Sequence, residues 1–123
     1  MSVKLIKISA VYFAIGVLLG MYMSMSHSYN LVPVHVHINL LGWTALTLAG
    51  IIYHLFPAAS ETKLAKIHFW GHNIGLPIMM IGLAFIVHGH TQVEPVIAVG
   101  ATITVVSVLL FVYNILKNIK SIT

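Results

Sequence analysis

The chain has 123 residues, of which 59% are hydrophobic and only 7% are charged, and its mean hydropathy is +1.01. This composition excludes an ordinary water-exposed globular surface and is typical of an integral membrane protein. The net charge is +4 and cysteine is absent, which excludes structural disulfides, thiolate metal sites and iron–sulfur clusters. Because eight histidines are present, any tightly held transition metal must rely mainly on imidazole.

Four long apolar segments follow one another, and each reaches the roughly 20 residues that cross a hydrocarbon core. They are too long for barrel strands and do not alternate with a period of two. We therefore predict an all-α fold, an integral membrane bundle of four transmembrane helices that forms one domain over residues 1–123. The predicted helices cover residues 6–26, 33–56, 61–88 and 94–118.

The lysines lie around the four apolar stretches at three places: before the first stretch, between the second and third, and after the fourth. They are Lys4, Lys7, Lys63, Lys66, Lys117 and Lys120. Because lysine in short loops favours the cytoplasmic side, both termini are predicted to be cytoplasmic. The basic charge is too dispersed for a nucleic-acid surface and indicates attraction to anionic lipid headgroups instead.

Prolines and small polar residues mark the helix ends. Pro33 and Pro95 suit the first turns of the second and fourth helices, and residues 60–62 can cap the third. Pro77 falls in the middle of the third helix and predicts a kink there, because its ring removes a backbone donor.

Small residues indicate where the helices meet. Gly16 and Gly20, and again Gly71 and Gly75, have the spacing that lets helix backbones approach closely in lipid. At about 100° per residue, a single stripe of the third helix gathers several polar and small residues. The stripe consists of His68, His72, Gly75, Met79 and Gly82. We expect it to face the bundle interior or a cofactor, not lipid.

The histidines divide into two tiers by depth. The outer tier contains His27, His35, His37, His88 and His90, and the inner tier contains His54, His68 and His72. At 1.5 Å rise per residue, His37 and His54 lie about 25 Å apart along one helix, so the tiers cannot share one metal ion. For His27, His54 and His90 an interfacial or hydrogen-bonded role is favoured. His35 and His37 project to nearly opposite sides of their helix and would serve two centres or two partners.

The sequence from Val34 to Trp43, VHVHINLLGW, resembles the His-x-His helix of the catalytic subunit of haem-copper oxidases, particularly the cbb3-type and nitric oxide reductase branches. The resemblance covers roughly residues 30 to 85, including Phe56-Pro57 and Ile67-His68-Phe69-Trp70. It implies a protein of the prokaryotic cytoplasmic membrane in which His35 ligates a high-spin haem and His37 a low-spin haem.

The chain also departs from the pattern of that family, because it has no His-x-x-x-Tyr and no His-His pair with which to build the oxidase copper site. We therefore do not expect a complete oxidase; if the chain is enzymatic, the resemblance implies an oxidoreductase. The family's catalytic subunit resembles three arcs of four helices. The likeness implies a homotrimer, with a homodimer as the alternative, and a possible redox partner protein.

These observations lead to a hypothesis of a haem b-binding membrane protein that transfers electrons or binds a diatomic gas such as O2 or NO. The candidate cofactor-binding residues are His35, His37, His68, His72, Asn39 and Trp43, with Asn39 as a hydrogen-bond donor and Trp43 as a packing surface. The candidate metal ligands are His35, His37, His72 and His88.

Two alternatives remain open. Met21, Met23, Met25 and His27 offer thioether and imidazole groups that suit copper, so a metal-ion binding or transport protein is one of them. On a helix, however, Met23 points away from Met21 and Met25, which favours apolar packing. The other alternative is a cofactor-free accessory subunit of a respiratory complex.

Overall fold

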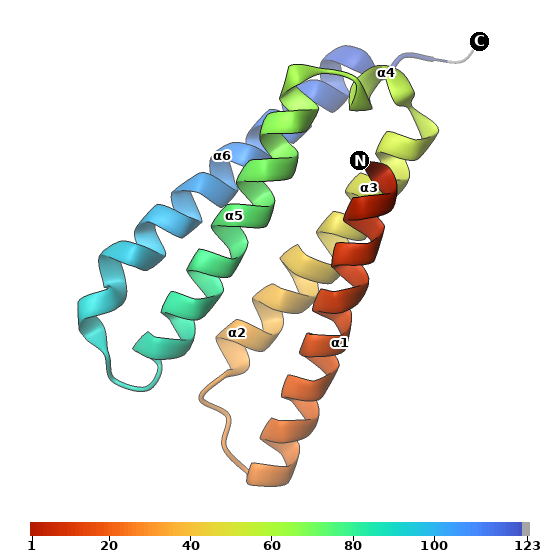
Figure 1. The fold of residues 1–123 in the computed structure, drawn as a ribbon. Coiled ribbons are helices and arrows are strands. Elements are labelled where there is room, and N and C mark those ends of the chain that lie inside the picture. Colours follow the sequence, from red (N-terminus) through yellow and green to blue (C-terminus); the bar gives the residue numbers. More distant parts are fainter. Residues whose placement is uncertain (122–123) are drawn as a thin grey trace.

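A computed structural model describes residues 1–121, and the described part of the chain contains helices and no strand (Figure 1). The elements are α1 (Ser2–Ser26), α2 (Val32–His37), the π-helix η1 (Ile38–Thr44), α3 (Ala45–Leu55), α4 (Pro57–Ser60), α5 (Lys63–Ile86), the 3-10 turn η2 (Thr91–Val93) and α6 (Glu94–Asn118). The predicted all-α fold is confirmed.

Within residues 1–121, four helical segments are long and apolar enough to cross a membrane: α1, the continuous run from α2 through η1 to α3, α5, and η2 with α6. They correspond to the four segments expected from the sequence. The first helix begins at Ser2, four residues before the predicted start. The third begins later than predicted, at Lys63, because Thr62 is its N-cap and accepts a hydrogen bond from the Ala65 amide.

The bundle consists of two helical hairpins. Figure 1 shows α1 running beside α2, η1 and α3, and α5 running beside α6, with α4 linking the hairpins at one end. The start of α1 and the end of α6 lie at this same end of the bundle. All three lysine pairs therefore lie toward one end, as positive-inside orientation requires, while the side of the membrane they occupy stays a prediction.

Glycines allow the close approach of α5 and α6. A Cβ added at Gly75 would lie 2.5 Å from Thr104 Oγ1 and 2.9 Å from the Gly100 carbonyl oxygen. Gly71 packs in the same way against Ser107, and Gly16 and Gly20 of α1 face Asn39 and His35. The prediction that both small-residue pairs mark helix contacts is confirmed.

The second span differs from the uninterrupted helix expected over 33–56. Between α2 and α3, the seven residues of η1 adopt π-helical bonding, and the Ala45 amide donates to the carbonyl of Leu40, five residues earlier. A π turn is rare and is stabilised by neighbouring contacts. Here Gly42 lies directly against the ring of Tyr12 on α1.

Candidate functional site

Two histidines lie in the interior of the bundle, on the face of α5 that the sequence predicted. The side chains of His68 and His72 are each only 1% exposed, and Gly75, Met79 and Gly82 of the same stripe are buried as well. The expectation that this stripe faces the bundle interior, and not lipid, is confirmed.

The two rings belong to a chain of three hydrogen bonds. The Tyr53 hydroxyl lies 2.9 Å from His68 Nδ1, His68 Nε2 lies 3.3 Å from His72 Nδ1, and His72 Nε2 lies 2.9 Å from the Leu41 carbonyl oxygen. Tyr53 comes from α3, the histidines from α5 and Leu41 from η1. We call this chain of groups the polar bracket, because it leaves the second span at Tyr53 and returns to it at Leu41.

The Leu41 carbonyl oxygen determines which atom donates each hydrogen bond of the polar bracket. Since the oxygen of Leu41 can only accept, His72 Nε2 carries the proton and Nδ1 accepts. His68 must then donate from Nε2 and accept at Nδ1 from the Tyr53 hydroxyl. All four ring nitrogens thus have protein partners, and either imidazole would have to break a hydrogen bond before it could bind iron.

Residues of α6 pack behind Tyr53. The Asn114 side chain is fully buried and donates a hydrogen bond to the Ala59 carbonyl oxygen at 2.9 Å. Asn118 donates to Asn114 Oδ1 at 2.7 Å. The Phe111 ring packs edge-on against Tyr53, with centroids 5.5 Å apart. Polar groups in an apolar interior are costly without partners, and these are largely satisfied.

His37 has a different environment. Its Nδ1 donates to the Pro33 carbonyl oxygen at 2.7 Å, one turn earlier on the same helix. This bond leaves the lone pair on Nε2, for which no partner occurs among residues 1–121. An imidazole whose second nitrogen is held by a backbone carbonyl is the usual arrangement of a histidine metal ligand.

His37 lines an apolar groove of about 280 Å³ between η1, α5 and α6. The other lining residues are Leu41, Met79, Ala101, Thr104, Val105, Val108 and Leu109. The Thr104 hydroxyl donates a hydrogen bond to the Gly100 carbonyl oxygen of its own helix. An acceptor nitrogen at the edge of an apolar wall is thus the main chemical feature of this groove.

His35 faces the other way. Its ring lies over Gly20 of α1, and the amide nitrogen of Asn39 is 3.3 Å from its Nε2. The predicted divergence of His35 and His37 is confirmed, and Asn39 is a hydrogen-bond partner of His35. Asn39 Oδ1 is the one buried side-chain polar atom without a partner in the described residues.

The other candidate residues are dispersed. Trp43 stacks on Phe13 of α1, with centroids 4.4 Å apart, and does not line the His37 groove. His88 donates from Nδ1 to the Ala84 carbonyl at 2.7 Å and is exposed beyond the end of α5. In the part of the chain that the structure describes, no three histidine or acidic side chains gather closely enough to hold a metal ion.

The methionines near the end of α1 do not gather either. Met23 is buried, whereas Met21 and Met25 are exposed. This difference agrees with the expectation that Met23 points away from the other two. The thioether groups therefore do not converge on one site within a chain.

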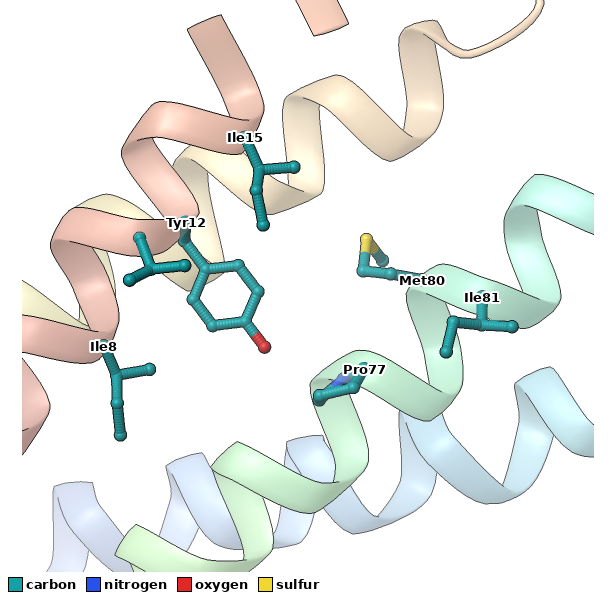
Figure 2. A pocket seen from close by; sticks show the side chains of 7 residues that line it. Ile8, Tyr12, Ile15, Pro77, Met80 and Ile81 are labelled. Atoms are coloured by element: carbon teal, nitrogen blue, oxygen red, sulfur yellow. The ribbon is translucent and has the colours of Figure 1, made fainter. Parts of the chain in front are cut away.

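A second cleft, of about 440 Å³, lies between α1 and α5 (Figure 2). It is lined by Ile8, Val11, Tyr12, Ile15, Pro77, Met80 and Ile81. The Tyr12 hydroxyl supplies its one polar side-chain group, and no histidine lines it. We therefore place the candidate cofactor site at the His37 groove.

Sequence reasoning did not find Tyr53, Asn114 or the Leu41 carbonyl. An asparagine within an apolar span is a signal for a buried polar group, and Asn114, near the C-terminal end of α6, had that signal. No residue type in the sequence marks which backbone carbonyl will accept a hydrogen bond from a side chain.

No family model, no curated protein and no solved structure matches this chain.

Proposed function

We propose that the protein binds haem b in the membrane and transfers electrons, with His37 as one axial ligand. The observation that carries this proposal is the hydrogen bond from His37 Nδ1 to the Pro33 carbonyl, which leaves Nε2 free beside an apolar groove. A neutral imidazole fixed in this tautomer is a suitable ligand for haem iron.

The residues of the groove fit one side of a porphyrin. Its aliphatic wall suits the flat apolar face of the macrocycle, and Met79 can adapt to the shape of the ring. At about 280 Å³ the groove is slightly smaller than the roughly 300–1,000 Å³ of a typical small-molecule pocket. It is also open at the side, so the rest of the group would lie outside one chain.

We therefore also propose that a second copy completes the site and supplies the second axial histidine. A trimer is the first expectation and a dimer the second, both from the resemblance to the oxidase subunit. Bound haem b iron would accept and release one electron. Two histidine ligands would favour electron transfer, whereas one open position would favour a diatomic gas.

The same resemblance and the lysine pattern support a location in a prokaryotic cytoplasmic membrane, with both termini on the cytoplasmic side. A redox partner would then meet the protein at either membrane surface. His35 remains a candidate ligand for a second centre, although its ring is held over Gly20 by packing and by Asn39.

The test is the optical spectrum of protein purified from haem-replete cells. The wild type should show a Soret band and, after reduction with dithionite, the sharp bands of a low-spin haem b. His37→Ala should lose the pigment, while His54→Ala, at an exposed position, should keep it. Carbon monoxide should leave the reduced spectrum unchanged if two histidines bind. Colourless wild-type protein, or a His37→Ala variant with full haem content, would exclude the proposal.

A further inference from the structure

The π-helix η1 sets the direction of His37 relative to the rest of its span. An α-helix turns by about 100° per residue, and Tyr53 follows His37 by 16 positions. In an uninterrupted helix the two side chains would point about 160° apart. A π turn takes up one extra residue, which reduces the angle to about 60°.

The observed contacts agree with the smaller angle. Tyr53 packs against Phe111 of α6, and His37 lines the groove with Val105 and Leu109 of the same helix. The side chains of Tyr53 and His37, which both belong to the second span, therefore face α6. Without the π turn, the His37 ring would point about 100° away from this direction.

The polar bracket spans the C-terminal part of η1. Leu41 lies inside the π-helix and Tyr53 lies in α3, and the two are joined through His68 and His72 of the neighbouring hairpin. Where π bonding returns to α bonding, the backbone register shifts by one residue and a carbonyl needs a different donor. The Ala45 amide donates to Leu40, and the next carbonyl, that of Leu41, accepts from His72.

We propose that His72 is a positioning residue that holds η1 in its π-helical register and thereby keeps His37 directed into the groove, with His68 and Tyr53 fixing the His72 ring. This inference rests on the proposed function only in taking His37 as the ligand. The positioning itself belongs to the protein without any cofactor and can be measured separately.

The first experiment measures the direction of residue 37 without haem. Because the chain has no cysteine, a spin label on His37→Cys reports one position. In reconstituted bilayers the label should be immobilised and poorly accessible to oxygen, which concentrates in lipid. Adding His72→Leu, which removes the donor to Leu41, should raise the oxygen accessibility at least twofold.

Conservative variants separate positioning from a general structural role. His72→Gln keeps a side-chain N–H that can reach the Leu41 carbonyl, so it should restore the low accessibility. His54→Leu makes the same replacement of histidine at an exposed position and should have no effect. Equal accessibility in the wild-type, His72→Leu and His72→Gln backgrounds would overturn the inference.

Should His72→Leu fail to fold, Tyr53→Phe decides the question, since it removes only the hydroxyl behind the His68 ring. It should raise the accessibility of the label at position 37, and Tyr113→Phe, at an exposed tyrosine of α6, should not. No change with Tyr53→Phe would then overturn the inference.

The second experiment uses the pigmented protein. His72→Leu should weaken haem binding by about 10- to 100-fold, the usual effect of losing a group that orients a metal ligand, and should shift the electron paramagnetic resonance g-values of the ferric haem. His72→Gln should restore both. Wild-type protein without haem would exclude the proposed function and leave the spin-label result standing. Pigmented protein whose affinity and g-values do not respond to His72→Leu would exclude the positioning role alone.

Discussion

Replacing Tyr53 by phenylalanine gives a quantitative test of the polar bracket. The phenyl ring keeps the packing against Phe111 and fills the same space, so no cavity is formed. The change removes one hydroxyl, which donates a hydrogen bond to His68 Nδ1 at 2.9 Å. Because His68 is buried, its Nδ1 is left without this partner.

The expected loss of stability follows from this contact. Interhelical hydrogen bonds in membranes average about 0.6 kcal/mol in double-mutant cycles, which is the contribution of the lost bond itself. A buried polar group left unsatisfied adds to this, at about 1–3 kcal/mol in water-soluble proteins. We therefore expect Tyr53→Phe to lower the free energy of unfolding by about 1–3 kcal/mol.

The measurement is reversible unfolding in mixed detergent micelles, followed by far-ultraviolet circular dichroism. Tyr113→Phe serves as the matched control, because that tyrosine is 54% exposed and should change stability by less than about 0.5 kcal/mol. A Tyr53→Phe variant as stable as this control would show that the hydroxyl contributes nothing, and the account of the polar bracket would be wrong.

Further predictions concern packing, topology and assembly. Gly75→Ala should destabilise the protein by about 1–3 kcal/mol through overpacking, since its Cβ would meet α6 backbone atoms at 2.9 Å. Gly20→Ala, whose Cβ would meet only the His35 ring at 3.1 Å, should cost less, and equal effects would refute this packing argument. Single cysteines at Tyr29 and His90 should react with a membrane-impermeant maleimide from outside intact cells, and one at Glu61 should not; the reverse pattern would invert the orientation. Native mass spectrometry should find the haem in trimers or dimers, and pigmented monomers would contradict a shared site.

The helical spans were predictable because hydropathy and length act locally. Each apolar segment needs its backbone groups satisfied within itself in lipid, so a helix is required whatever its neighbours are. The buried stripe of α5 was predictable for the same reason, since α5 is α-helical from Lys63 to Ile86 and about 100° per residue holds throughout. His68 and His72 therefore lie on the expected face.

The π-helix was not predictable in this way. Its register depends on contacts with other helices, namely His72 donating to Leu41 and the Tyr12 ring against Gly42. One extra residue left the depth of His37 nearly unchanged but rotated its direction by about 100° relative to α3. The facing direction of the second span therefore needed the structure.

Tyr53 shows a related limit of sequence reasoning. A tyrosine near the end of a span is usually an interfacial anchor, yet here it is 1% exposed and bonded to His68. It also packs against Phe111 on α6, which lies far away in the sequence. Local patterns do not encode such a pairing.

The most direct measurement of the central claim is chemical rescue of His37→Ala. Wild-type protein from haem-replete cells should be pigmented, and the variant should be colourless because the iron has lost its ligand at the groove. Added imidazole should restore the low-spin haem spectrum by occupying the vacated position beside Pro33. A variant that binds haem as well as the wild type without imidazole would contradict the assignment of His37.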